Sequence, residues 1–194
     1  MRLFIALELE GNVRKRLKEI QAALRREVDP RWVRWVQPDG IHLTLKFLGE
    51  VDAGKATDLE LALARQVPHH VPCRFQVAEV GAFPNPDRAR VLWIGLRDEG
   101  RSIAALQAGI EDALEGVGFP RERRPFAPHL TLGRVREGIG GEAQANLGRV
   151  LRAFPGLEPV DTGADQVRLV RSELRPEGAV HTVLGVFSLG EERG

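Results

Sequence analysis

The sequence predicts an α+β fold made of two similar lobes related by an approximate two-fold axis. The tetrapeptide HLTL occurs at 42–45 and again at 129–132, an offset of 87 residues. Around each copy the hydrophobic pattern runs strand, helix, strand, helix, strand, and the short connections favour sheets with helices on one face. The two halves span about 1–82 and 90–189, and we expect them to form one bilobal domain over 1–194.

The first half is assigned from its periodicity. An apolar run at 2–9 has the length of a strand covered on both faces. A helix follows, with its apolar stripe at Val13, Leu17, Ile20 and Leu24. Short strands are predicted at 32–36 and 41–48, separated by the turn Pro38-Asp39-Gly40. Asp52 is a candidate cap for the next helix, whose stripe is Ala56, Leu59, Leu63 and Val67, and a strand at 73–82 ends this half.

The second half repeats this order after a turn at 84–87. Strands are predicted at 90–96 and 129–135, and the helix between them carries Ile103, Leu106, Ile110 and Leu114. A second helix at 141–154 contributes Leu147, Val150, Leu151 and Phe154. Strands at 165–174 and 179–189, joined by a turn at 175–178, complete the pattern.

Composition excludes several classes of protein. The chain is 43% hydrophobic with a formal net charge of +1, which rules out intrinsic disorder and nucleic-acid binding through bulk charge. A phosphate or RNA site must therefore depend on local placement of charge. The single cysteine, Cys73, cannot form an intrachain disulfide. No apolar run reaches the ~20 residues of a membrane span, and the N-terminus does not resemble a signal peptide. We expect a cytoplasmic protein, not bound to membranes, that acts as a monomer.

Each HLTL copy places an imidazole and a hydroxyl on one face of a strand. Alternate residues share a face, so His42 and Thr44 point away from the core, as do His129 and Thr131 in the other lobe. A packing pattern retained after duplication explains the leucines but not the histidines and threonines. If the lobes face each other, two imidazoles and two hydroxyls converge on one cleft.

Two facing imidazoles are suited to acid–base catalysis at phosphorus. One can act as base toward an attacking water while the other, protonated, acts as acid toward the departing oxygen. The threonine hydroxyls can donate hydrogen bonds to non-bridging phosphate oxygens. The sequence has no cluster of metal-ligand spacing, so we expect no metal and no cofactor.

The paired motifs resemble those of the 2H phosphoesterase superfamily. Their wider contexts, HLTLKFLGE at 42–50 and PFAPHLTLGR at 125–134, are similar to its RNA 2′,3′-cyclic phosphodiesterase branch, also called LigT-like or 2′-5′ RNA ligase-like. The resemblance spans essentially the whole chain. It implies two lobes, each a mainly antiparallel sheet with helices on its outer face, and an active-site cleft between them. It also implies an RNA or oligoribonucleotide partner with a 2′,3′-cyclic phosphate end, hydrolysed to a 2′-phosphomonoester.

The resemblance implies a role for each motif residue. His42 would be the proton donor to the leaving 3′-oxygen and His129 the proton acceptor that activates water, while Thr44 and Thr131 would bind phosphate oxygens. Strict alternation sends two further candidates, Arg134 for phosphate and Phe47 for the terminal base, to the opposite face. For them to reach the cleft the strand must bulge or end first, which Gly133 allows for Arg134. A core position is the alternative for Phe47. Lys46 shares the face of His42 by parity, as a phosphate ligand or a solvated lysine.

Other features leave alternatives open. Arg121, Arg123 and Arg124 precede the second motif and are either solvated or guide an RNA backbone. Trp35 and Trp93 are expected in the core, and His181 carries no functional prediction. Hydrolysis is the leading function. The alternatives are the reverse 2′-5′ ligation of RNA ends and a non-catalytic RNA- or nucleotide-binding module.

Overall fold

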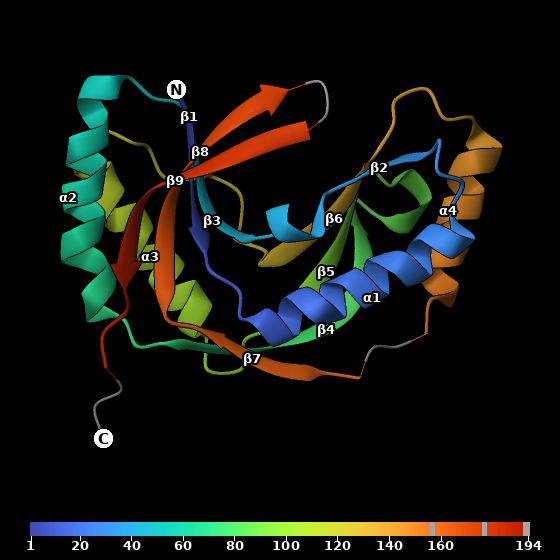
Figure 1. Ribbon diagram of the computed structural model, residues 1–194, viewed down its shortest axis with the longest axis horizontal. Helices are drawn as coiled ribbons and strands as arrows, with labels where there is room; N and C mark the ends of the chain where they lie inside the picture. The colour runs from blue at the N-terminus through green and yellow to red at the C-terminus, as the bar shows by residue number, and fades with distance from the viewer. Residues whose placement is uncertain (156–157, 176–177, 192–194) are drawn as a thin grey trace.

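The computed structural model describes residues 1–155, 158–175 and 178–191, and it has the predicted α+β architecture (Figure 1). Within those residues one antiparallel sheet of nine strands is covered by four α-helices. The strands are β1 (Arg2–Leu7), β2 (Val33–Trp35), β3 (Leu43–Glu50), β4 (Cys73–Phe83), β5 (Val91–Arg97), β6 (His129–Val135), β7 (Val160–Ala164), β8 (Gln166–Arg175) and β9 (Gly178–Ser188). The helices are α1 (Gly11–Glu27), α2 (Ala56–Gln66), α3 (Ser102–Glu115) and α4 (Gly141–Ala153).

The sheet has two four-stranded parts that meet at one strand pair. The strand order is β7-β4-β5-β6 in one part and β3-β1-β8-β9 in the other. Leu43 of β3 and Leu130 of β6 are the paired residues that join them, and β2 lies along β6 where β3 has diverged from it. Helices α2 and α3 flank the β1–β3 part, whereas α1 and α4 flank the β4–β6 part (Figure 1). These two parts form two lobes, but neither lobe corresponds to one of the sequence halves 1–82 and 90–189.

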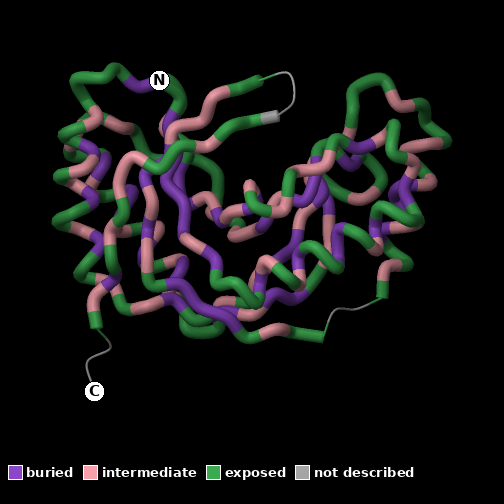
Figure 2. Tube along the Cα trace, in the orientation of Figure 1, coloured by how far each residue is buried: buried purple, intermediate pink, exposed green. Residues whose placement is uncertain are grey.

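Each lobe combines strands from both halves of the sequence. β4 ends the first half, yet it pairs with β5 of the second half, and β8 returns from the second half to pair with β1. Figure 2 shows the buried positions running along the strands from one lobe into the other. Within each lobe, strands of the two sequence halves are therefore joined by hydrogen bonds.

The predicted helix stripes form the core. Their fully buried members are Val13, Leu17, Leu24, Leu59, Leu63, Val67, Ile103, Leu106, Ile110, Leu114 and Leu147. On the opposite side of α1 from solvent, the Gln21 amide donates to the carbonyls of Val36 and Leu132, at 2.7 and 3.0 Å, and so fixes this helix against β6. Val150 and Phe154 are only half-buried, because α4 lies at the outer edge of its lobe.

One prediction about the elements was wrong, and one strand was missed. Asp52 makes no capping hydrogen bond with its side chain; it precedes a 3-10 turn at Ala53–Lys55, and α2 begins only at Ala56. β7 was not predicted, because a five-residue strand that contains Asp161 and Gly163 lacks an apolar pattern. The centre of the predicted turn, Pro176 and Glu177, lies outside the described residues. In the described part of the chain, no helix is long and apolar enough to cross a membrane.

Candidate active site

The two HLTL motifs meet at the pair that joins the lobes. Leu43 and Leu130 are fully buried on the core side, so the residues that flank them face the other side of the sheet. Because this pairing is antiparallel, His42 lies on the side of Thr131 and Thr44 lies on the side of His129. Each imidazole therefore has the hydroxyl of the other lobe as its neighbour, in an arrangement with approximate two-fold symmetry.

A bulge at the last residue of each motif changes the face of the residues beyond it. In β3 the register with β1 shifts at Leu45, and in β6 the register with β5 shifts at Leu132. Phe47 and Arg134 consequently stand on the same face as the motif residues, and both line the cleft. The bulge required for Arg134 is thus present. Gly133 is needed there for space: a Cβ would lie 2.7 Å from Val33 Cγ1 of β2.

The bulge in β3 overturns the prediction for Lys46. Parity placed this lysine on the face of His42, but the structure buries it on the core side, where only 7% of it is exposed. Its ammonium bonds to the carboxylate of Glu111 on α3 and donates to the carbonyl of Pro120 at 2.8 Å. Lys46 is therefore a structural ion-pair partner, and it does not reach the cleft.

The backbone fixes the tautomer of both histidines. Nδ1 of His42 lies 2.9 Å from the carbonyl oxygen of Gly40, and Nδ1 of His129 lies 2.7 Å from that of Ala127. A carbonyl only accepts, so Nδ1 must carry the hydrogen in each ring. Nε2 is then the nitrogen left to accept or donate a proton, and this arrangement is the same in both motifs.

His42 lies in an aromatic setting. Its ring stacks on Phe4 of β1 with a centroid distance of 4.5 Å, and it meets His181 of β9 edge to face at 5.2 Å. Burial lowers the pKa of His42 to about 4, the hydrogen bond to Gly40 opposes this shift, and the charges of His181, Arg14 and His129 add to it. His129 has a different neighbour, the ring of Phe83, edge to face at 4.9 Å.

A cleft of about 530 Å³ lies between the lobes, and His42, Thr44 and Thr131 line it. His129 is not among its lining residues. One wall comes from β1, β3, β8 and β9 and the other from β2, the turn after it and β6. The lining residues that concern the chemistry are His42, Thr44, Phe47, Thr131, Arg134, Phe4, His181, Arg2, Arg34 and Trp35. The last five were not predicted as site residues; for Arg34 the alternation in WVRWV, with buried Val33 before it, was the available signal.

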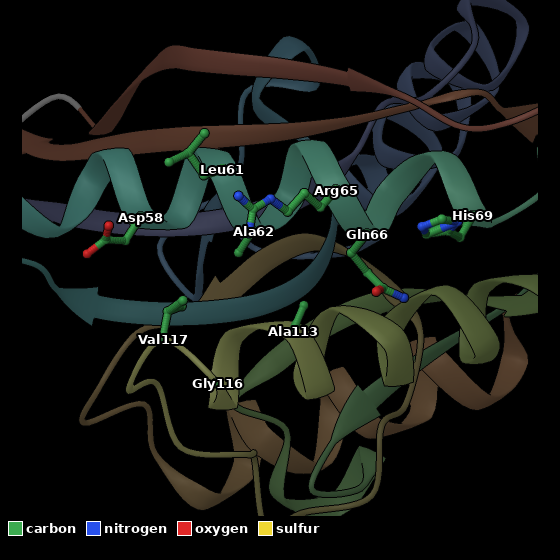
Figure 3. A pocket seen from close by; sticks show the side chains of 9 residues that line it. All are labelled: Asp58, Leu61, Ala62, Arg65, Gln66, His69, Ala113, Gly116 and Val117. Atoms are coloured by element: carbon green, nitrogen blue, oxygen red, sulfur yellow. The ribbon is translucent and has the colours of Figure 1, made fainter.

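A second hollow, of about 390 Å³, lies on the outer surface between α2 and α3 (Figure 3). Its titratable side chains do not converge, since Asp58 and His69 lie toward opposite ends of the α2 face. Arg65 lies between them. Within the described ranges, no group of three or more His, Cys, Asp or Glu side chains is arranged to hold a metal ion.

In the basic loop before the second motif, two of the three arginines pair with carboxylates. Arg121 pairs with Asp112 of α3, and Arg124 pairs with Glu122 at 3.5 Å. Glu111 also accepts from the backbone N–H of Glu122 at 3.2 Å, which ties the loop to α3.

The chain matches the family model described as LigT like Phosphoesterase twice, over residues 7–93 and again over 94–181. Each match contains one HLTL motif. The chain belongs to the LigT-like phosphoesterase family. Its sequence is 40% identical over 200 residues to the RNA 2′,3′-cyclic phosphodiesterase of Thermus thermophilus, covering 100% of this chain and 93% of that protein. It is 32% identical over 189 residues to the protein of that name from Methanothermobacter thermautotrophicus, covering 97% and 99%.

Solved structures of LigT-like proteins have the same fold. The crystal structure of a Thermus thermophilus protein superposes with a TM-score of 0.79 at 32% identity, covering 100% of both chains. The crystal structure of Escherichia coli LigT complexed with 3′-AMP gives a TM-score of 0.76 at 26% identity, covering 97% of each chain. The bilobal α+β fold predicted from the sequence is confirmed.

Proposed function

We propose that this LigT-like phosphoesterase hydrolyses RNA 2′,3′-cyclic phosphodiester ends to 2′-phosphomonoesters, without a metal, through His42 and His129. The observation that carries the proposal is the equivalent state of the two rings: each Nδ1 is held by a backbone carbonyl, which leaves each Nε2 free at the junction of the lobes. The name shared by the curated relatives supports the substrate class.

In the proposed reaction the two rings act on opposite sides of the phosphorus. His129 Nε2 accepts a proton from water as the water oxygen bonds to phosphorus, and the bond between phosphorus and O3′ breaks. His42 donates its Nε2 proton to the departing O3′. The products are a 3′-hydroxyl and a 2′-phosphomonoester, and one proton has passed from His42 to the product and one from water to His129.

The remaining motif residues hold the phosphate and the nucleoside. Thr44 and Thr131 donate hydrogen bonds to the non-bridging oxygens, where negative charge accumulates in the transition state. Arg134 adds a positive charge on the same face. Phe47, 65% exposed at the cleft wall, offers a flat surface for the terminal base.

The low pKa of His42 has to be reconciled with a role as proton donor. A pKa of about 4 makes this ring neutral near pH 7 in the free protein. The cyclic phosphate carries a negative charge, and an anion close to an imidazole favours its protonated form. We infer that His42 takes up its proton when the substrate binds, so that the acid is generated only in the complex.

The test is turnover of a short oligoribonucleotide that ends in a 2′,3′-cyclic phosphate, in EDTA, with the product identified by phosphorus NMR. We expect a 2′-phosphomonoester from the unmodified protein, and losses of at least about 100-fold for His42→Ala and His129→Ala. His69→Ala is the matched control, because His69 is exposed on the outer surface, and it should keep full activity.

Other results would redirect the assignment. A 3′-phosphomonoester would mean that the other P–O bond breaks. Binding without turnover would favour the non-catalytic module, and joined 2′-5′ products with a 5′-hydroxyl RNA would favour ligation. Activity that EDTA abolishes would contradict the metal-free mechanism.

A further inference from the structure

Beyond the Leu43–Leu130 junction, the two strands that carry the motifs place different kinds of side chain on the cleft face. Along β6 the cleft face continues from His129 and Thr131 to Arg134, which pairs directly with Arg34 of β2. Along β3 it continues from His42 and Thr44 to Phe47, and this strand ends at Glu50. The approximate two-fold symmetry is therefore broken, with a basic side of the cleft on β6 and an aromatic side on β3.

Arg34 of β2 and Arg134 of β6 stand directly opposite each other in an antiparallel pair. Residues directly opposite in antiparallel strands point to the same face, and two like charges in that arrangement repel. Both side chains are exposed and line the cleft, and no ion pair joins either of them to a carboxylate in the described part of the chain. An anion between them would offset the repulsion.

The other arginine of the cleft does not have this property. Arg2 is opposite Glu50 in the pairing of β1 with β3, so its direct neighbour across the strands is not a second cation. The Glu50 carboxylate itself pairs with the N-terminal ammonium at 3.4 Å. None of the described residues that line the cleft is acidic. Arg34 and Arg134 are therefore the two cleft arginines that stand directly opposite another positive charge.

We propose that Arg34 binds the phosphodiester group one nucleotide upstream of the cyclic phosphate, and that the preferred substrate is RNA of at least two nucleotides. This rests on the proposed function, with the cyclic phosphate at the junction and Arg134 beside it. Arg34 stands directly opposite Arg134 on the neighbouring strand β2 and on the same face. A chain whose cyclic phosphate lies beside Arg134 would therefore bring its next phosphodiester to Arg34, with its backbone on the β2–β6 side and its terminal base on the β3 side.

The experiment compares kcat/KM for three substrates with a 2′,3′-cyclic phosphate: a mononucleotide, a dinucleotide, and the same dinucleotide with an uncharged methylphosphonate linkage. We expect the unmodified protein to prefer the charged dinucleotide by about tenfold over both others at low salt. Arg34→Gln should lose about tenfold on the charged dinucleotide and less than threefold on the mononucleotide. Arg65→Gln, which removes the same charge from the outer hollow between α2 and α3, should retain the preference.

Comparing both proteins on the charged and the uncharged linkage separates direct contact between Arg34 and the phosphodiester from a general effect of its positive charge. With the uncharged linkage Arg34→Gln should cause little further loss, because the group it would contact is gone. A melting temperature at least equal to that of the unmodified protein would show that the Arg34→Gln variant is folded. A higher melting temperature would show in addition that the repulsion between the two arginines is relieved. Equal hydrolysis of mononucleotide and dinucleotide by the unmodified protein, or an equal loss on all three substrates in Arg34→Gln, would overturn the subsite. The absence of turnover on every substrate would instead overturn the proposed function.

Discussion

His42 illustrates how burial and the backbone set the state of one residue. Removal of the ring from water disfavours the imidazolium, which is why its pKa falls to about 4, although the Gly40 carbonyl favours the charged form. An unfolded histidine titrates near 6.5. The unfolded chain therefore binds a proton at this residue over a pH range in which the folded protein does not.

The sign of the resulting pH dependence follows from linkage. The contribution of His42 to folding stability is fully present above about pH 6.5 and is lost as the pH falls toward 4, by up to about 3 kcal/mol. Urea unfolding from pH 7.5 to 4 should show a smaller decrease for His42→Gln than for the unmodified protein. The quantity to compare is how steeply the free energy of unfolding falls with pH in the two proteins. Each slope alone also contains the contributions of His70 and His181, whose pKa values are lowered as well. Identical slopes would contradict burial of a neutral His42.

The same residue should respond to an anion in the cleft. In the free protein we expect the His42 ring resonances to titrate near pH 4, and we expect a nucleoside 2′-monophosphate to raise that pKa. The His42→Gln variant identifies the resonance. A pKa that does not move when the nucleotide is bound would remove His42 as the proton donor.

Residue positions beside the motifs show where sequence reasoning ends. His42, Thr44 and Thr131 could be placed in the cleft from alternation alone, because each lies within two residues of a buried leucine. Phe47 and Lys46 could not, since a single bulge at Leu45 exchanges their faces, and a bulge has no marker in HLTLKFL. The rings of Phe4 and His181 come from β1 and β9, so their approach to His42 depends on the tertiary pairing of distant segments.

At the scale of elements, β3 is held to α3 by a buried charge pair. The side chains of Lys46 and Glu111 are each only 5% exposed. Gln107 also donates to Glu111 at 3.0 Å, so the carboxylate has several partners. Because Lys46 directly precedes Phe47, this anchor fixes the strand at the point where it turns the aromatic ring into the cleft.

Breaking this pair should cost much more than breaking an exposed one. Glu111→Gln leaves the Lys46 ammonium buried without a counter-charge, and we expect a loss of about 3 kcal/mol in the free energy of unfolding. Asp112→Asn at the next position removes the partner of Arg121 in an exposed pair and should cost less than about 1 kcal/mol. Urea denaturation compares the two. The double change Lys46→Met and Glu111→Leu should recover most of the loss, and equal losses for both single variants would mean that Lys46 is solvated.

Elements with strong periodicity were predicted from sequence, and those defined by their neighbours were not. The stripes of α1 and α3 repeat at helical spacing and are buried as expected. β7 is a strand because the edge of β4 provides its hydrogen-bond partners between Cys73 and Val77. Its own residues, VDTGA, favour a turn as much as a strand.

On the scale of the whole molecule, the sheet joins the two repeated halves of the sequence. Each lobe takes strands from both halves, so neither half has a complete sheet without the other. The family matches divide the chain at 93–94, in the middle of β5, which is a central strand of its lobe. We propose on these grounds that residues 1–194 fold as one cooperative domain with two lobes.

The positions of the tryptophans make this proposal testable. Trp32, Trp35 and Trp93 lie on or beside β2 and β5, so their fluorescence reports on one lobe, whereas far-UV circular dichroism reports on both. Leu63→Ala removes a fully buried side chain from α2 in the other lobe and should cost about 3 kcal/mol. If the lobes unfold together, the fluorescence midpoint in urea shifts as far as the circular dichroism midpoint. Leu147→Ala in α4, which belongs to the same lobe as the tryptophans, is the matched control and shifts both signals in either case. A fluorescence transition that Leu63→Ala leaves unmoved would mean that the lobes unfold independently, and that the single Leu43–Leu130 connection and the exchanged strands do not couple them.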